Sequence, residues 1–361
     1  MKILHVLPGL TPGGMERLVV QLVQDAAAHG DNVVVASGPG AWVEKVTAAG
    51  AEHVALPATT RGAAFGMAAA TARLAQCVRR LHPRVVHSHN VRATVLARLA
   101  LAVAHHRAAL VPTLHGVSPR DYRMASRVLS CTTGRVIACA PSVSRSLQAA
   151  GFPRDRIDVI TNGALLRPAG HEREADLRRS LALGQASLVL GIGRLVEQKN
   201  WPVFIEAAGH LSGPVFAVAG EGSLKQQLVD LARRHGSPVR FLGAVDDIAA
   251  LVGLSACVVS TSDWEGLPLA LLEALSLGTP VVATAVDGVT DVVPPRAALL
   301  VPPGDAAAVS AAVSRILADD GFAARLRQEA LAAASAWRPE RMLGQYRSAY
   351  LAAAAGRTPW V

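Results

Sequence analysis

Short apolar runs alternate with longer amphipathic stretches along most of the chain. The apolar runs lack the polar alternation of a half-exposed strand, so they predict strands that are buried on both faces. In the first half, strands are expected near 2–7, 32–37, 53–56, 84–88, 109–114, 135–139 and 157–161. Helices are expected between them, notably over 14–29, 65–81, 91–106 and 141–150. This alternation predicts a parallel sheet with helices on both faces.

The pattern lapses around 162–186, where the turn pair Asn162-Gly163 precedes Pro168, Gly170 and a charged run. It then restarts, with strands expected near 187–192, 214–219, 239–242, 256–260, 280–284 and 298–301. The predicted fold class is therefore α/β, with two doubly wound, Rossmann-like domains facing each other across a cleft. We expect domains over 1–165 and 187–344, a linker over 166–186, and ligands at the carboxyl ends of the strands.

The most informative stretch is 265–273, which follows the expected strand 256–260 and a loop. Pro268 suits the first turn of a helix, and Gly278 suits its C-terminal stop. Glu265 then lies in the loop before the helix, and Glu273 lies inside it. A helix N-terminus at a strand end binds phosphate, and carboxylates beside it would accept hydrogen bonds from the hydroxyls of a ribose or a sugar. The alternative is that Glu265 only complements the helix charge and Glu273 is a solvated surface residue.

Two glycine loops follow the first strands of the two halves. The loop at 8–16 contains Gly9 and Gly14, but Met15-Glu16 replaces the Lys-Ser/Thr of an NTP-hydrolysing P-loop. The loop at 191–200 has Val196 where a dinucleotide-binding fingerprint requires glycine, which argues against a dehydrogenase. Its two cations, Arg194 and Lys199, are placed to bind a diphosphate, although a solvated surface position is the alternative. A close-approach loop is also expected at 219–222, and 241–245 is expected to end a third strand on the same edge of the sheet.

Histidines occur at two expected strand ends. His87 and His89 lie one residue apart and point to the same side of the chain, a spacing that could chelate zinc. No HExxH motif or cysteine partner supports a metal, so none is expected. His115 follows the strand 109–114 and is either a core or solvated residue, or a hydrogen-bond donor or proton carrier in the cleft.

Composition and charge limit the alternatives. Apolar residues make up 51% of the 361 residues and charged residues 17%, which favours a large core over disorder. The net charge of +9 lies in the first half, because residues 1–165 carry 18 Lys and Arg against 8 Asp and Glu. These cations are scattered with little aromatic interleaving, so we expect no nucleic-acid partner and consider attraction to an anionic membrane surface instead.

The location expected is cytoplasmic, with attachment at the inner face of the membrane as an option. No apolar stretch reaches the roughly 20 residues of a membrane span. The N-terminus meets Pro8-Gly9 too soon for a signal peptide and is interpreted as a first strand. The four cysteines, Cys77, Cys131, Cys139 and Cys257, lie in apolar context without a metal-binding spacing, which favours reduced, buried thiols.

Taken together, these motifs resemble those of the retaining family 4 glycosyltransferases with the GT-B fold. The resemblance spans nearly the whole chain in order and is carried by Gly13-Gly14-Met15-Glu16, His87-Ser88-His89, His115-Gly116, Asn162-Gly163, Gly193-Arg194-Leu195 with Lys199, Gly220-Glu221-Gly222, Glu265 through Glu273, 278–282 and 302–305. The pair of glutamates with seven residues between them, combined with the two cations, is its specific part. It implies that the last helix, about 338–354, and the end of the chain, about 345–361, cross back onto the first domain.

The resemblance also implies roles. His115, Arg194, Lys199 and Glu265 would be catalytic, with the two cations stabilising the leaving nucleoside diphosphate in place of a metal and Glu265 holding the transferred sugar. Donor-binding positions would be Gly14, Gly222, Val245, Gly266, Leu267 and Glu273. The acceptor side would include Glu16, His87 and His89. No cofactor is implied, since the nucleoside-diphosphate sugar is a substrate.

Two segments depart from the family pattern. Pro83-Arg84 stands where an acidic residue is common, and 287–291 reads Asp-Gly-Val-Thr-Asp where a Gly-Gly-x-x-Glu turn is usual. The function expected is metal-independent, retaining transfer of a sugar to a hydroxyl acceptor, in envelope polysaccharide or glycolipid synthesis. The alternatives are glycosylation of a small soluble metabolite, a GT-B-type epimerase, and a basic module that binds a polymer or a membrane without catalysis.

Overall fold

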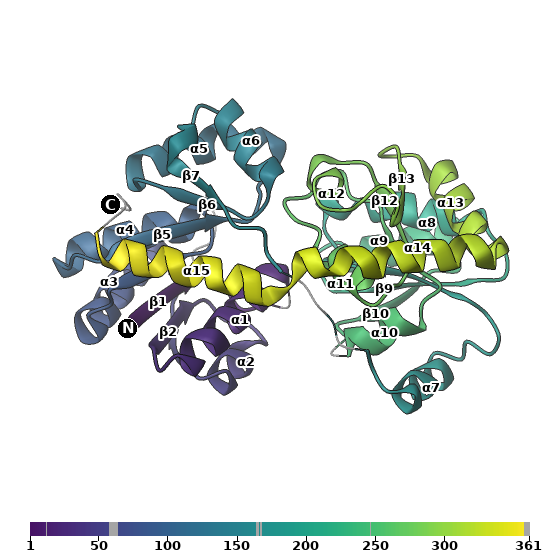
Figure 1. The fold of residues 1–361 in the computed structure, drawn as a ribbon, viewed down its shortest axis with the longest axis horizontal. Helices are drawn as coiled ribbons and strands as arrows, with labels where there is room; N and C mark the ends of the chain where they lie inside the picture. Colours follow the sequence, from purple (N-terminus) through teal and green to yellow (C-terminus); the bar gives the residue numbers. More distant parts are fainter. Residues whose placement is uncertain (12, 58–63, 164–165, 167, 246, 357–361) are drawn as a thin grey trace. The chain divides into compact units, whose positions relative to one another are not determined.

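The computed structural model of the protein describes all residues except 12, 58–63, 164–165, 167, 246 and 357–361. The chain forms two compact units. Unit 1 consists of Met1–Asn162 together with Glu340–Val361, and unit 2 consists of Gly163–Pro339. Each unit has its own parallel sheet (Figure 1). Each also has its own hydrophobic packing on both faces of that sheet.

Unit 1 is built on a parallel sheet with the strand order β3-β2-β1-β4-β5-β6-β7. Its strands are β1 (Lys2–Leu7), β2 (Asn32–Ser37), β3 (Glu52–Ala55), β4 (Val85–Ser88), β5 (Ala109–Leu114), β6 (Val136–Ala138) and β7 (Ile157–Val159). Its helices are α1 (Gly14–Ala28), α2 (Val43–Ala48), α3 (Ala64–Leu81), α4 (Val91–Ala104), α5 (Tyr122–Thr132), α6 (Pro141–Ala149) and α15 (Pro339–Ala354), with 3-10 turns η1 (Pro119–Asp121) and η2 (Arg154–Arg156).

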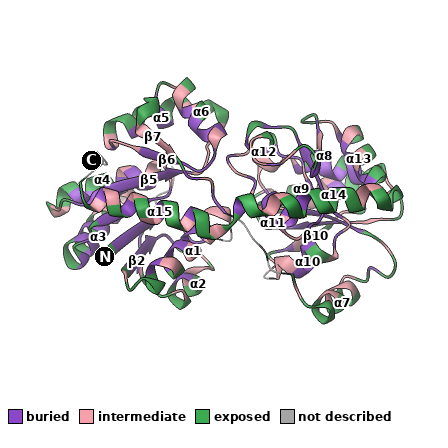
Figure 2. Ribbon diagram, viewed as in Figure 1, coloured by how far each residue is buried: buried purple, intermediate pink, exposed green. Residues whose placement is uncertain are grey.

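The two faces of this sheet have separate cores. Helices α1, α2 and α15 pack on one face and α3 and α4 on the other, so the last helix of the chain lies against its first strand. The inner strands β1, β2, β4, β5 and β6 are almost wholly buried, whereas the edge strands β3 and β7 are partly exposed; Figure 2 shows the outer sides of the helices exposed. In α4 the side chain of Asn90 accepts a hydrogen bond from Ala93 N (2.7 Å) and caps the helix, a contact that typically contributes about 1 kcal/mol.

Unit 2 has the strand order β10-β9-β8-β11-β12-β13. Its strands are β8 (Leu188–Ile192), β9 (Val215–Ala219), β10 (Arg240–Gly243), β11 (Cys257–Ser260), β12 (Val281–Thr284) and β13 (Ala298–Val301). Its helices are α7 (His171–Ser180), α8 (Trp201–Gly209), α9 (Lys225–Arg234), α10 (Ile248–Leu254), α11 (Leu269–Ser276), α12 (Asp287–Thr290), α13 (Ala306–Ala318) and α14 (Asp320–Ala333), with η3 (Glu197–Lys199) and η4 (Ala334–Trp337). Helices α8, α9 and α13 cover one face, and α10, α11 and α12 cover the other.

Each predicted strand is present within two residues of its expected ends. The stretch expected as a linker contains α7, which has no buried residue. Acidic residues in its first turn and basic residues in its last turn complement the helix dipole, so charge rather than an apolar face marks this helix. The hinge role of 166–186 stays a prediction.

One expectation about the cysteines is wrong. Cys131 is exposed on α5, whereas Cys77, Cys139 and Cys257 are buried as expected and all four are free thiols. Burial raises the pKa of Cys139 and of Cys257 to about 12. Among the described residues, no helix is both long enough and apolar enough to span a bilayer.

Candidate active site

The site in unit 2 lies where two neighbouring central strands end. Strands β8 and β11 are adjacent and parallel, and Val259 pairs with Gly191 near their carboxyl ends. β8 connects to β9 on one side, while β11 connects to β12 on the other, so the connections diverge at this point. Such a switch point leaves a hollow at the strand ends, which is where open α/β sheets bind ligands.

Glycines bring the loops after β8 and β9 into close backbone contact. Gly220 has φ +158°, and a Cβ placed there would lie 1.9 Å from Gly193 O. A Cβ at Gly222 would lie 2.3 Å from Leu195 O, so neither position has room for a side chain. The loops are joined by a hydrogen bond from Leu195 N to Glu221 O (2.9 Å). The predicted close-approach loop at 219–222 is confirmed as a fixed wall beside Arg194.

Lys199 and Glu265 form an ion pair across these strand ends. Lys199 Nζ lies 2.6 Å from Glu265 Oε1, and their side chains are only 17% and 5% exposed. Ser262 Oγ donates a second hydrogen bond to the same carboxylate oxygen (2.6 Å). Because Lys199 is the last residue of η3 and Glu265 precedes α11, two segments distant in sequence supply a cation and a carboxylate to one place.

Gln198 connects this ion pair to Arg194. Its amide Nε2 donates to Trp264 O (3.0 Å) and approaches Glu265 Oε2 (3.4 Å). Its Oε1 lies 3.5 Å from Arg194 Nη2, at the limit of a hydrogen bond. The side chain of Arg194 is exposed, so its charge is available to a ligand.

The other predicted donor-binding residues of unit 2 lie in the loop after β10, directly before α11 and inside it. Gly266 is buried, and Leu267 and Val245 are half-buried at the edge of one hydrophobic core. Helix α11 begins at Leu269, one residue later than Pro268 suggested, and Gly278 follows it with φ +73°. Glu273 is only 4% exposed, so the alternative that it is a solvated surface residue is wrong.

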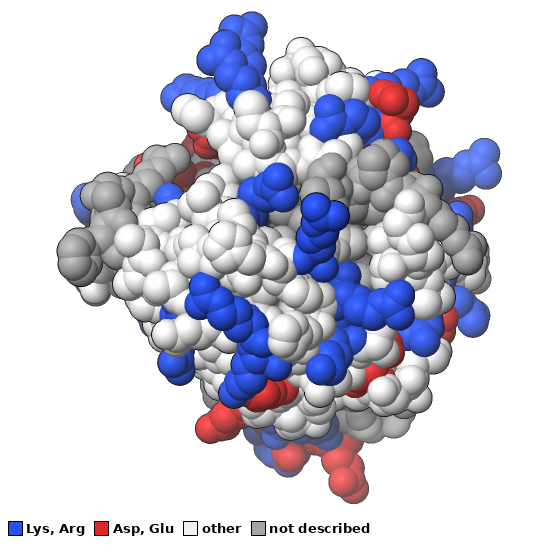
Figure 3. Space-filling model, turned by 90° about the vertical axis from the view of Figure 1, so that its left-hand side faces the viewer, with Lys and Arg blue, Asp and Glu red and all other residues white. Residues whose placement is uncertain are grey.

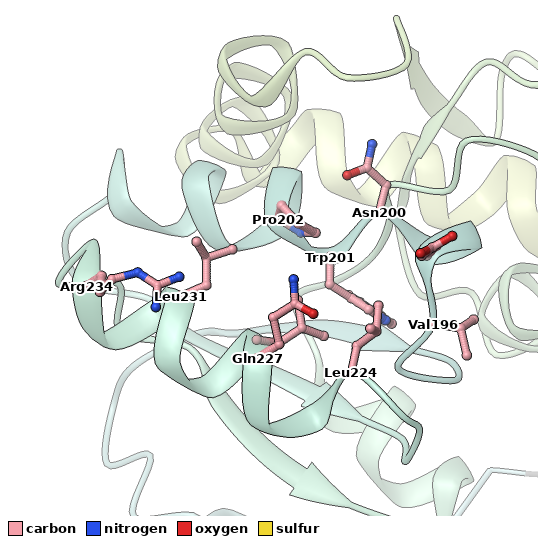
Figure 4. Close-up of a pocket in the computed structure, with 10 residues that line it drawn as sticks. Val196, Asn200, Trp201, Pro202, Leu224, Gln227, Leu231 and Arg234 are labelled. Atoms are coloured by element: carbon pink, nitrogen blue, oxygen red, sulfur yellow. The ribbon is translucent and has the colours of Figure 1, made fainter.

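A pocket of about 250 Å³ adjoins this site. Its walls come from the loop after β8, the start of α8 and the length of α9 (Figure 4). Glu197 and Asn200, the sequence neighbours of Gln198-Lys199 on either side, both line it. None of the predicted site residues lines the pocket, so it is a neighbour of the strand-end site and not the site itself.

In unit 1, the glycine loop leads directly into α1. Gly14 is the first residue of α1, and Gly13 precedes it in an extended conformation. A Cβ at Gly13 would lie 2.6 Å from Glu16 Oε2, so the Glu16 side chain folds back over this glycine. Glu16 is 7% exposed and lies in the first turn of the helix, where a carboxylate interacts favourably with the dipole.

A cluster of imidazoles lies between the unit 1 sheet and α15. The strand register pairs His5 with His87, and His5 Nδ1 is 3.0 Å from His89 Nε2. The rings of His87 and His89 have centroids 3.9 Å apart, and His89 stacks on His115 at 5.7 Å. The structure therefore brings the three predicted histidines together and adds His5, which sequence reasoning missed.

Two tyrosines of α15 complete this polar cluster. Tyr350 Oη is 2.6 Å from His87 Nδ1, and Thr113 Oγ1 is 2.7 Å from His87 Nε2. Tyr346 Oη lies 3.4 Å from Thr113 Oγ1 and 3.5 Å from Asn162 Oδ1. Both tyrosines are buried at a spacing of four residues on one helix face. The network ties the C-terminal helix to β4 and β5.

The cluster bears on metal binding. One nitrogen of each of His5, His87 and His89 lies within 4.8 Å of the others. Burial lowers the pKa of His5 to about 3 and of His115 to about 4, and it holds the pKa values of His87 and His89 well below 6.5. Neutral imidazoles can ligate metals, but both nitrogens of His87 already bond to hydroxyls. The arrangement fits a hydrogen-bonded polar core better than a metal centre.

Comparison with known proteins identifies the family. Residues 12–164 match the family model "Glycosyltransferase Family 4", and residues 172–332 match "Glycosyl transferases group 1". The lipopolysaccharide core biosynthesis glycosyltransferase LpsD of Rhizobium meliloti is 27% identical over 90% of this chain and 91% of its own length. The chain belongs to the family 4 glycosyltransferases. A galactosyltransferase of Escherichia coli that acts on an N-acetylglucosaminyl-diphosphoundecaprenol is 29% identical over 56% of this chain and 58% of its own length.

Solved structures show the same fold. The Anabaena protein HepE in complex with UDP-glucose superposes with a TM-score of 0.87 at 22% identity, covering 97% of this chain and 99% of that one. WaaG, a glycosyltransferase of lipopolysaccharide biosynthesis, superposes with a TM-score of 0.76 at 16% identity over 95% and 98% of the two chains. This glycosyltransferase therefore has the GT-B fold.

The structure gives physical accounts of both departures from the family pattern. Arg84 Nη2 donates to Ala354 O (3.2 Å), so the cation in place of the usual acid sits at the C-terminus of α15, where it complements the helix dipole. In the second segment, Asp287–Thr290 forms the short helix α12. A Cβ at Gly288 would lie 2.3 Å from Glu265 O, so the one retained glycine is where α12 packs on the Glu265 backbone.

The predicted site residues of this glycosyltransferase fall into two groups. Arg194, Lys199 and Glu265 are joined in unit 2, while the histidines and Glu16 belong to unit 1. Convergence of both groups on one ligand stays a prediction, as do the individual roles. Sequence reasoning missed Gln198 and Ser262, although polar residues in the segments that follow buried strands were an available signal.

Proposed function

We propose that the protein transfers a sugar from a nucleoside-diphosphate sugar to a hydroxyl acceptor, with retention of the anomeric configuration and without a metal. The observation that carries this proposal is the ion pair of Lys199 and Glu265 beside Arg194 at the carboxyl ends of β8 and β11. A diphosphate needs cations, and a sugar needs a carboxylate that accepts hydrogen bonds from its hydroxyls. The glycine wall at 220–222 lets a ligand approach the backbone closely.

The chemistry is electrostatic. Breaking the bond between the sugar and the diphosphate develops negative charge on the leaving group, and Arg194 with Lys199 would stabilise that charge in the transition state. The buried N-terminus of α11 adds a partial positive charge. In this scheme Gly14 contributes a backbone amide from unit 1, Glu273 binds the ribose, and His115 touches the sugar. Retention rests on family resemblance alone.

The donor assignment is tested by thermal-shift screening against UDP, GDP and ADP and their glucose conjugates. We expect one base to raise the melting temperature, with and without EDTA. A protein that responds to none of them refutes the donor class, and a response that EDTA abolishes refutes metal independence. NMR of the product decides the anomeric configuration, and an inverted product contradicts retention.

A lipid-linked or envelope acceptor is supported by the surface of unit 1. Helix α4 exposes Leu99 (43%) and Val103 (46%), and α5 exposes Met124 (69%). Exposed arginines lie on the same helices and on the segments next to them: Arg79, Arg98, Arg107, Arg120, Arg123 and Arg127. Figure 3 shows Lys and Arg spread over this end of unit 1 with few Asp or Glu among them. Apolar side chains surrounded by cations suit the interface of an anionic bilayer.

Membrane attachment is tested by sedimentation with vesicles. We expect binding to vesicles that contain anionic phosphatidylglycerol, weaker binding at high salt, and none to neutral phosphatidylcholine vesicles. The related enzyme that acts on a diphosphoundecaprenol acceptor makes such an acceptor a natural first choice. Equal turnover of water-soluble and lipid-linked acceptors, with no vesicle binding, would favour a soluble metabolite.

A further inference from the structure

The Glu265 carboxylate has more partners than its ion pair needs. Oε1 is bound by Lys199 Nζ and by Ser262 Oγ, each at 2.6 Å, and Gln198 Nε2 lies 3.4 Å from Oε2. Only one of these three partners is a cation. The two neutral donors therefore remain on the carboxylate if Lys199 moves away from it.

Movement of Lys199 is required by the proposed function, on which this inference rests. While Lys199 is paired with Glu265, its charge is compensated and little of it acts on a diphosphate. We propose that Gln198 and Ser262 are positioning residues that hold the Glu265 carboxylate in place when Lys199 turns from Glu265 to the donor diphosphate. They thereby release a cation for the substrate without leaving a buried carboxylate unpaired.

The burial of Glu265 makes such holding necessary. Its side chain is 5% exposed, and a carboxylate at that depth is strongly destabilising when its partners are removed. Lys199, at 17%, keeps more access to solvent. Its backbone is anchored, since Thr261 Oγ1 donates to Lys199 O (3.0 Å), so the side chain can change partner while the loop stays fixed.

The neighbours of Gln198 allow only one orientation of its side-chain amide. Trp264 O (3.0 Å from Nε2) can only accept a hydrogen bond, and Arg194 Nη2 (3.5 Å from Oε1) can only donate one. The NH2 group therefore faces Glu265. In addition, Asp263 N donates to Gln198 O (3.0 Å), which fixes the backbone of Gln198 beside the loop that carries Glu265.

The holding role is tested first without ligand, by thermal unfolding of Gln198→Met in the wild-type and Lys199→Met backgrounds. Lys199→Met imitates a lysine that has left the carboxylate. We expect Gln198→Met to lower the melting temperature about twice as far in that background, because Glu265 then loses its second partner. Equal shifts in the two backgrounds would overturn the proposal. Gln226→Met, on the exposed side of α9, is the matched control and should shift both equally.

The release role is tested by calorimetric titration with UDP, and with GDP and ADP as further probes. We expect Gln198→Met and Ser262→Ala each to weaken binding by about tenfold, the effect of losing one hydrogen bond to a charged group. In the Lys199→Met background Gln198→Met should no longer weaken it, a result that a merely structural role does not produce. Unchanged affinity in Gln198→Met overturns the inference alone. A wild-type protein that binds none of the probes refutes the proposed function instead, and the ligand-free comparison still decides the holding role.

Discussion

The buried histidines of unit 1 predict that this unit is lost selectively in mild acid. His5, His87 and His89 are each fully buried, and burial lowers all three pKa values, that of His5 from 6.5 to about 3. Because the folded pKa lies below the unfolded one, the unfolded chain binds more protons between these values. The stabilisation is therefore complete above pH 6.5 and falls as the pH drops through 6.5 toward the folded pKa.

The magnitude follows from the width of this window. From the unfolded pKa of 6.5 down to pH 5, each histidine that stays neutral in the folded state lowers the free energy of unfolding by about 2 kcal/mol, at about 1.4 kcal/mol per pH unit. His5 alone therefore accounts for about 2 kcal/mol, and the lowered pKa values of His87 and His89 act in the same direction, against a stability of about 5–15 kcal/mol for an ordinary domain. Unit 1 should thus lose a substantial part of its stability by pH 5.

Hydrogen exchange with mass spectrometry measures both units in one sample. Peptides from β1, β4 and β5 should lose protection between pH 7.5 and pH 5, after correction for intrinsic exchange rates. Unit 2 is the internal control, because its histidines, His171, His210 and His235, are all exposed. The Asp31 carboxylate, paired with the N-terminus and Arg347, has its pKa lowered from 3.8 and acts only at lower pH. Equal loss in both units, or none in unit 1, would refute the reasoning.

Three further predictions concern the site and the packing. Arg194→Ala and Lys199→Ala should each lower turnover on the order of 100-fold or more, measured as nucleoside diphosphate release at saturating donor, because each removes charge stabilisation from the leaving group. Tyr350→Phe should lower the free energy of unfolding by about 1–3 kcal/mol in urea titrations, since His87 Nδ1 is left buried without a partner. Gly220→Ala should abolish nucleotide binding or folding, as its Cβ would lie 1.9 Å from a backbone oxygen; circular dichroism and calorimetry distinguish the two.

Matched substitutions sharpen these tests. Lys225→Ala removes an exposed ion pair to Glu221 and should leave turnover near the wild-type value. Tyr346→Phe loses only contacts of 3.4 and 3.5 Å and should destabilise less than Tyr350→Phe. Gly209→Ala, with no atom within 4 Å of its Cβ, should fold normally. Wild-type turnover in Arg194→Ala, greater harm from Tyr346→Phe, or normal binding by Gly220→Ala would each contradict the corresponding account.

The fold was predictable because buried parallel strands leave a plain signal. Runs such as 33–36 and 281–283 are apolar at every position, since both faces of the sheet are covered. Helix α7 was not predicted, because it buries none of its residues and so shows no apolar face in the sequence. The sequence signal for this helix was its charge pattern, with acidic residues in the first turn and basic residues in the last.

The candidate site was predictable as far as residue types at strand ends are concerned. Arg194, Lys199 and Glu265 were named from their loops, and the ion pair joins two of them. The hydrogen-bond partners of Glu265, Gln198 and Ser262, could not be predicted. Their contacts depend on side-chain geometry, which a single sequence does not specify. The same holds for His5, whose pairing with His87 depends on the register of β1 against β4.

The position of α15 has a consequence for how the protein is made. Its buried face, which includes Met342, Tyr346 and Tyr350, fills the core of a unit whose other elements all come from Met1–Asn162. Residues 163–339 are contiguous and can close their own core while synthesis continues. Unit 1 therefore cannot complete its core before α15 has been made, whereas the core of unit 2 needs no segment made after Pro339.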